Sequence, residues 1–214
     1  MSRLTILHHI EAWRFWLIGR WLSYPKTDVD LNFPPFSLRS PGAMIDWPLK
    51  REMEAICLEK EFGPQSGCKK EFHDSKNFEI PAFYGKCGIY GFKSKEIALE
   101  RAKDDERYRG LILGRVALWG NIIENEGGVY RAKWAYPLSI ELGICKNCGN
   151  LIPLNRANLF GYFFSWGTLL GYTLVICNHC CSKIRYREIF PPGWHYSIVQ
   201  QYGISVETSI KGWK

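Results

Sequence analysis

The sequence lacks the local motifs that identify common classes of enzyme. Its 214 residues contain no Walker phosphate loop, no recognisable Ser-His-Asp set and no paired-carboxylate motif. Each of those reactions needs its groups in a defined arrangement, so the absences argue against catalysis of these types. A catalytic site assembled from residues far apart in the chain is the alternative, but we expect a protein without catalytic activity.

A secretory leader is also missing at the start of the sequence. Residues 1–26 carry charges at Arg3, Glu11, Arg14 and Arg20 and lack the apolar core and cleavage site of a signal peptide. The chain is long enough to bury a hydrophobic core, so its eight cysteines are not needed as disulfides. We therefore expect a cytoplasmic protein with reduced thiols.

The composition is that of a folded and basic protein. The formal net charge is +7, the sequence pI is near 9.0, and aromatic residues make up 15% of the chain. A positive balance favours anionic partners, of which nucleic acid is the most frequent.

Two Cys-x-x-Cys pairs are the strongest chemical signal in the sequence. Cys145 and Cys148 form the first pair, and Cys177 and Cys180 form the second. Two intervening residues let the chain turn so that both thiolates reach one ion at about 2.3 Å, and two such pairs complete a tetrahedron. The spacing therefore predicts a metal site with these four cysteines as ligands.

The first pair resembles the knuckle of a zinc ribbon, in which a glycine, here Gly149, follows the second cysteine. The second pair departs from that pattern, because Cys181 stands in place of the glycine. Cys180, Cys181 and His179 are therefore all candidates for the fourth ligand. Zinc is the preferred ion, with iron as the alternative, because rubredoxin-like sites use similar pairs. The resemblance implies a structural ion within residues 143–190.

The stretch between the two pairs is nearly free of charge. No Asp, Glu, Lys or Arg occurs between Arg156 and Lys183. Such a stretch could span a membrane, and Gly167-x-x-x-Gly171 is a spacing found where membrane helices meet. A spanning segment would, however, separate the cysteine pairs by about 30 Å of hydrocarbon. We therefore expect a long hairpin that brings the pairs together, and no transmembrane segment.

A second and looser set of metal-binding residue types precedes these pairs. It consists of Cys57, Cys68, His73 and Cys87. The residue types suit another zinc ion, but their spacing matches no knuckle. Scattered core thiols are the preferred interpretation, and a second ion is the alternative.

The rest of the pattern predicts an α+β fold, with a mixed or antiparallel sheet and flanking helices. Apolar residues at a spacing of 3.6 predict a helix over residues 5–22, and a proline-rich loop follows it. Ser94 is expected to cap a helix over 95–109. Strands are expected over 111–124 and 129–136, joined by a glycine-containing turn.

The chain is expected to close with a helix over 194–202 and a short strand after it. We predict three parts. An α+β domain with the N-terminal helix covers 1–142, a zinc-ribbon-like module covers 143–190, and the helix and strand of 191–214 pack back.

Cations and a tyrosine near the second cysteine pair and on the preceding strand are candidates for nucleic-acid binding. They are Arg131, Lys133, Lys183, Arg185, Tyr186 and Arg187. Lysine and arginine neutralise phosphates, and an aromatic ring stacks on an unpaired base. The alternative for Arg131 and Lys133 is that they form only the solvated face of a strand. The sequence thus predicts a zinc-binding, non-catalytic protein that binds nucleic acid or a protein partner.

The segment Gly88-Ile89-Tyr90, with the helix and strand that follow it, resembles the NAD-binding elements of ADP-ribosyltransferases. The resemblance implies an NAD-binding protein, with or without activity, as the alternative function. The later catalytic glutamate of that family has no counterpart on the strand over 129–136, where Lys133 is central. Glu124 or Glu126 would have to serve from the turn.

Overall fold

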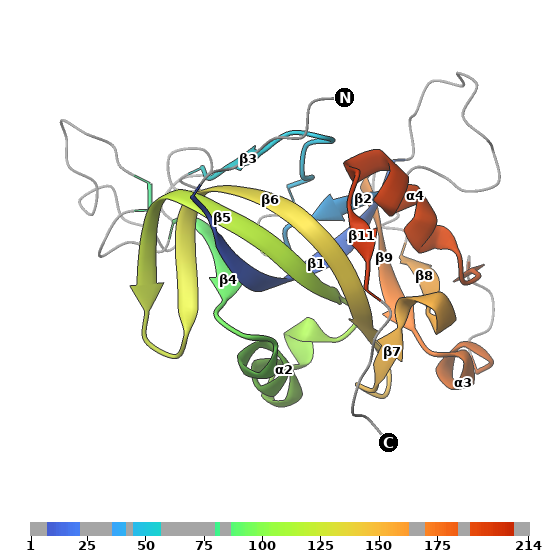
Figure 1. Cartoon of the computed structure of the whole chain (residues 1–214). Helices are drawn as coiled ribbons and strands as arrows, with labels where there is room; N and C mark the ends of the chain where they lie inside the picture. The colour runs from blue at the N-terminus through green and yellow to red at the C-terminus, as the bar shows by residue number, and fades with distance from the viewer. Residues whose placement is uncertain are drawn as a thin grey trace. The chain divides into compact units, whose positions relative to one another are not determined.

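The structure is a computed structural model, shown in Figure 1. It describes residues 8–21, 36–41, 45–56, 80–81, 87–162, 170–183 and 189–207. The described strands pair almost entirely antiparallel, and a few short helices accompany them. The predicted α+β fold with an antiparallel sheet is therefore confirmed at this level.

The chain folds into two compact units, each made of three segments. The first unit contains Met1–Arg14, Arg51–Ala98 and Arg115–Pro137. The second contains Phe15–Lys50, Leu99–Gly114 and Leu138–Lys214. Both cysteine pairs belong to the second unit.

The first unit is a small sheet with the start of one helix. Its elements are the beginning of β1 (Ile10–Trp21), β3 (Met53–Glu54), β4 (Ile89–Phe92), the beginning of α2 (Lys95–Asp104), the larger part of β5 (Ile112–Asn125) and the first half of β6 (Val129–Ile144). β4 pairs antiparallel with β6, and β3 pairs with β6 further along the strand. The predicted turn between β5 and β6 is confirmed, with positive φ at Gly127 and Gly128.

The second unit carries the remaining elements and the ends of the long strands. The further elements are β2 (Phe36–Arg39), η3 (Glu106–Tyr108), β7 (Leu151–Pro153), η4 (Leu154–Arg156), β8 (Asn158–Tyr162), β9 (Leu170–Ile176), α3 (Asn178–Cys181), β10 (Ile189–Phe190), α4 (Trp194–Tyr202) and β11 (Ser205–Val206). β9 pairs with β8 on one side and with β1 on the other, and β1 pairs with β2.

The core of the second unit is rich in aromatic side chains. Trp16, Phe36, Trp194 and Tyr202 are fully buried. Helix α4, red in Figure 1, packs against β2 and β11. The indole Nε1 of Trp194 donates to the carbonyl of Ala157 at 2.8 Å, so the buried N–H has a partner. The predicted closing helix is confirmed, and it ends at a glycine in the left-handed region.

The predicted helix over residues 5–22 is wrong. Residues 10–21 form strand β1, and the first seven residues lie outside the described part of the chain. In the second unit β1 lies between β2 and β9, and each residue from Phe15 to Gly19 is buried. A strand that is buried on both faces does not show the alternation of apolar and polar residues by which a strand is recognised in a sequence. Its continuous apolar run therefore also fits a helical stripe, although aromatic and β-branched residues favour strands.

Two other boundaries differ from the sequence prediction. The helix that follows Ser94 ends at Asp104, and a short 3₁₀ turn, η3, takes the place of its last residues. Strand β6 does not stop before Pro137 but continues to Ile144. Proline fits a strand where its missing N–H is not required by the ladder.

Candidate metal centre

The first cysteine pair lies in the turn of the β6–β7 hairpin. Ile144, the last residue of β6, pairs with Leu151, the first residue of β7. The turn closes through hydrogen bonds from the Cys145 N–H to the Asn150 carbonyl and from the Gly149 N–H to the Cys145 carbonyl. Gly149 has φ +73°, a conformation that glycine adopts without strain. The turn therefore places both cysteines of the first pair on one tight hairpin.

The second pair lies where β9 gives way to α3. Cys177 is the N-cap of α3, and its sulfur accepts a hydrogen bond from the Cys180 N–H at 3.4 Å. Cys181 continues the helix, and Ser182 after it is still right-handed helical. No left-handed residue is needed here, which explains why the second pair lacks the glycine of the first.

The hairpin between the pairs is confirmed. β8 and β9 pair antiparallel from Asn158↔Ile176 to Tyr162↔Tyr172. The segment joining them, residues 163–169, lies outside the described residues. Over the part of the chain that the structure describes, no helix has the length and apolar character needed to cross a membrane.

The segment after η3 joins the two cysteine-bearing strands to each other. The Gly110 N–H donates to the Ile144 carbonyl at 2.8 Å, and the Ile144 N–H donates to the Leu111 carbonyl at 2.9 Å. On the other side the Val175 N–H donates to the Gly110 carbonyl at 2.9 Å. Ile144 precedes Cys145 directly and Val175 lies two residues before Cys177. These hydrogen bonds therefore position both pairs through the backbone.

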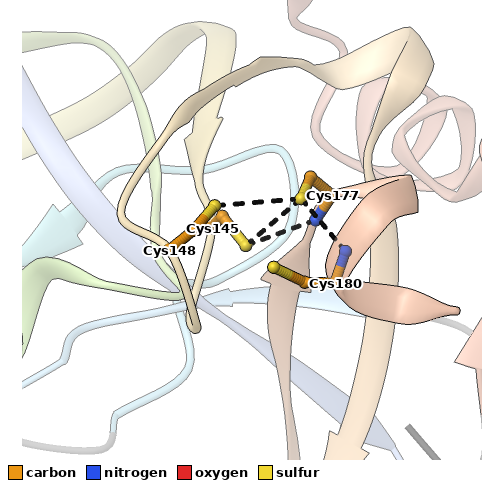
Figure 2. Close-up of side chains that lie close together, drawn as sticks. All are labelled: Cys145, Cys148, Cys177 and Cys180. Carbon is orange, nitrogen blue, oxygen red and sulfur yellow. Dashed lines mark hydrogen bonds between the residues drawn. The ribbon is translucent and has the colours of Figure 1, made fainter. Parts of the chain in front are cut away.

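Figure 2 shows the side chains of Cys145, Cys148, Cys177 and Cys180 converging on one point. Their sulfur atoms all lie within 4.8 Å of one another. The Cys177 sulfur is 3.7 Å from that of Cys145 and 3.9 Å from that of Cys148. An ion about 2.3 Å from each sulfur of a tetrahedron requires edges of about 3.8 Å. The four cysteines could therefore hold one metal ion with little movement.

Hydrogen bonds and burial affect the four thiols unequally. Burial raises the pKa of the Cys180 thiol to about 12, and the neighbouring cysteines add to the effect. Burial acts in the same direction on Cys145, but backbone N–H groups of Cys148, Cys177 and Asn147 outweigh it and lower its pKa to about 7. A divalent cation is the group that would hold all four as thiolates near neutral pH.

Among the described residues the cluster contains Cys180 and neither of the other two candidates for the fourth ligand. Cys181 is partly exposed on α3, and His179 is exposed. The extent of a separate module over residues 143–190 remains a prediction.

The second predicted set of ligands cannot be assembled from the described residues. Cys57, Cys68 and His73 lie outside them. Cys87 lies just before β4 and is buried. A second ion therefore remains a prediction.

The predicted nucleic-acid-binding residues have different surroundings. Lys183 is exposed, whereas Arg185, Tyr186 and Arg187 lie outside the described residues. Lys133 is partly exposed, 3.8 Å from a carboxylate oxygen of Glu54. Arg131 is 3% exposed and donates to the carbonyl of Cys87 and the side chain of Asn125. Arg131 therefore does not lie on a solvated face of the strand, which was the alternative interpretation of this residue.

Sequence inspection considered His179 only as a possible metal ligand and missed the exposure of the residues inside the two Cys-x-x-Cys pairs. Lys146, Asn147, Asn178 and His179 are all exposed. A signal was available, because the residues between two ligands of a knuckle lie at the tip of a turn, where they face solvent.

Arg109 was also missed. It lies on the segment after η3, and its Nε atom is 3.4 Å from the position that a Cβ atom on Gly149 would occupy. It also forms an ion pair with Glu106 at 2.8 Å. No sequence signal links residue 109 to a cysteine pair that follows it by more than thirty residues, because strand pairing brings them together.

The order of elements noted for the ADP-ribosyltransferase resemblance is present, since β4, α2 and β5 follow one another. NAD binding remains a prediction. Comparison with protein families, curated proteins and solved structures finds nothing that matches this chain.

Proposed function

We propose that the protein binds one zinc ion through Cys145, Cys148, Cys177 and Cys180, and that the basic surface around this ion binds nucleic acid. The observation that carries the proposal is the convergence of four sulfur atoms between two turns whose exposed residues include Lys146 and Lys183. The ion joins these turns, so it fixes the relative positions of their cations.

Zinc is the ion that the donor set favours. Four cysteines in a tetrahedron are typical of structural zinc sites. Four thiolates also leave no open coordination position for a substrate or a reactive water, so the centre supports a structural and non-catalytic role. Iron in a similar tetrahedron is the alternative ion, and the absorption spectrum of the purified protein distinguishes the two.

Charge in the metal-bearing region supports an anionic partner. No Asp or Glu occurs between Glu141 and Glu188. The cations in this region are Lys146, Arg156, Lys183, Arg185 and Arg187. The first three are exposed in the structure. Such a distribution favours contacts with phosphates, whose counterions are released on binding.

Single-stranded nucleic acid suits the side chains better than a duplex. Exposed Asn147 and His179 offer hydrogen bonds to base edges beside Lys146 and Lys183. Tyr186 follows in the sequence between two arginines and provides a ring on which a base can stack.

Fluorescence anisotropy of a labelled single-stranded oligonucleotide, titrated with zinc-loaded protein at several salt concentrations, tests the proposal. We expect binding at low salt that weakens steeply as salt rises. Absence of binding at low salt, together with a co-purifying protein, would instead assign the surface to a protein partner.

Matched lysine variants localise the surface. Lys146→Gln and Lys183→Gln should each weaken binding and reduce the salt slope by about one, since each removes one phosphate contact. Lys50→Gln is the control, because Lys50 is exposed but lies outside both cysteine-bearing turns. Equal effects of all three variants would contradict the assignment.

A further inference from the structure

The four cysteines of the candidate metal centre differ in their exposure to solvent. Cys145 and Cys180 are buried, Cys177 is partly exposed and Cys148 is exposed. The sulfurs of Cys148 and Cys177 lie 3.9 Å apart, and the upper dashed line in Figure 2 joins them. The two more exposed cysteines of the centre therefore have neighbouring sulfurs.

We propose that Cys148 and Cys177 form a redox-modification site, at which a hydroperoxide converts two metal ligands into a disulfide and thereby weakens nucleic-acid binding. This inference rests on the proposed function, because the binding surface that it regulates is the one around the same ion.

The reaction balances with hydrogen peroxide as the oxidant. The Cys148 thiolate attacks one peroxide oxygen, the O–O bond breaks, hydroxide leaves, and the sulfur becomes a sulfenic acid. The Cys177 thiolate then attacks this sulfur, the S–O bond breaks, a second hydroxide leaves, and the S–S bond forms. The two thiolates together lose two electrons, which reduce the peroxide to two hydroxide ions.

Disulfide formation requires the two sulfurs to approach from 3.9 Å to about 2.05 Å. The exposed position of Cys148 on a hairpin turn favours it over Cys145, whose sulfur is also near Cys177 but is buried. The accessible pair is therefore the expected site of oxidation.

Loss of two thiolates removes half of the coordination sphere. Cys145 and Cys180 alone do not form a closed tetrahedral site, so the affinity for the ion falls. The disulfide still joins the two turns, but it draws the sulfurs of Cys148 and Cys177 from 3.9 Å to about 2.05 Å, and Cys180 of α3 is no longer held by the ion. Lys146 and Lys183 therefore change their relative positions, and the affinity for nucleic acid falls.

The backbone favours recovery after reduction. The hydrogen bonds of Gly110 and Leu111 to Ile144 and Val175 do not involve the ion. They keep the two cysteine-bearing strands in place, so reduction of the disulfide restores a site that can bind zinc again.

The test treats zinc-loaded full-length protein with graded hydrogen peroxide. Zinc release is followed with a chromogenic chelator, the disulfide is identified by peptide mass spectrometry, and oligonucleotide binding is followed by anisotropy. We expect zinc release in proportion to a Cys148–Cys177 disulfide, a several-fold loss of binding, and recovery of both with reductant and added zinc.

Several outcomes separate this inference from its alternatives. Zinc release without the Cys148–Cys177 disulfide, or with a different pair, overturns the site. The Cys181→Ser variant retains all four ligands and should behave as the wild type; protection by this change would assign the chemistry to Cys181. Oxidation that leaves nucleic-acid binding unchanged overturns the regulation. Failure of the untreated protein to bind nucleic acid overturns the proposed function instead, and the disulfide result stands by itself.

Discussion

Gly149 and Gly203 have nearly the same backbone conformation, with φ of +73° and +67°. Their surroundings differ, because a Cβ atom on Gly149 would lie 3.4 Å from Arg109, whereas none of the described atoms lies within 4 Å of one on Gly203. Gly149 also directly follows Cys148, a proposed metal ligand. Substitutions at the two glycines therefore distinguish the general loss of stability at a left-handed position from a specific effect on the proposed metal centre.

We predict that Gly149→Ala and Gly203→Ala each lower the free energy of unfolding by about 1 kcal/mol, because a side chain disfavours this backbone conformation. Only Gly149→Ala should also reduce zinc affinity, measured by competition with a chelator. Equal zinc affinities of the two variants would show that the first turn does not position a ligand.

His195 is a buried titratable residue whose role can be tested by pH. It is 2% exposed, and its Nδ1 atom has no hydrogen-bond partner among the described residues. Burial lowers its pKa below the ordinary value of 6.5. The unfolded chain therefore takes up a proton at a higher pH than the folded chain does, and stability falls as pH drops below about 6.5.

His195→Phe should remove that part of the pH dependence. The phenyl ring keeps the aromatic contacts with Trp194 and Tyr196 but cannot be protonated. Unfolding temperatures of both proteins between pH 7.5 and pH 5 provide the measurement. Parallel curves for the variant and the wild type would show that His195 does not titrate in this range.

At the scale of elements, the hydroxyl group of Tyr202 links α4 to β2 in addition to the packing between them. The N–H of Leu38 donates to the Tyr202 hydroxyl, and the hydroxyl donates to the Trp47 carbonyl, both at 2.9 Å. Burial raises the pKa of Tyr202 far above its ordinary value, so the hydroxyl stays protonated and can donate.

Tyr202→Phe should lower the free energy of unfolding by about 1–3 kcal/mol, because it removes the acceptor of the buried Leu38 N–H and a donor to the Trp47 carbonyl. Chemical denaturation measures this change. Tyr196→Phe is the matched control, since Tyr196 lies on the same helix and is 63% exposed. A loss of stability in the control as large as in Tyr202→Phe would contradict the role of the buried hydroxyl.

Elements with local signals can be predicted from the sequence, and elements defined by distant partners cannot. Nearby glycines predict the β5–β6 turn and the end of α4. The β8–β9 hairpin follows from the requirement that both cysteine pairs bind the same ion. β1 is a strand because β2 and β9 pair with it, and those partners lie far away in the sequence. Its own residues leave the choice between helix and strand open.

The candidate site shows the same division. Cys-x-x-Cys spacing is local, so the sequence alone identifies Cys145, Cys148 and Cys177, and it leaves Cys180, Cys181 and His179 as candidates for the fourth ligand. Only the fold brings Cys180 together with the other three sulfurs. The burial of Arg131 and the position of Arg109 beside the first turn depend on strand pairing and packing, which the spacing of residues does not encode.

For the whole molecule, removal of zinc should lower the unfolding temperature, because an ion that binds only the folded chain stabilises it. We expect a strong chelator to produce this shift while the far-ultraviolet circular dichroism at about 20 °C stays nearly unchanged. The reason is that backbone hydrogen bonds through Gly110 and Leu111 hold the site without the ion. Complete unfolding on chelation would show that the ion, rather than the sheet, holds this region together.

The zinc content of protein purified without chelator tests the central claim most directly. Elemental analysis of the wild type, Cys180→Ser and Cys181→Ser should give close to one zinc per chain for the wild type and for Cys181→Ser, and much less for Cys180→Ser. Two zinc ions per chain in the wild type and one in Cys180→Ser would indicate a second zinc site in addition to the four-cysteine centre. A wild type without metal, or a Cys180→Ser variant that retains its full zinc content, would contradict the four-cysteine centre.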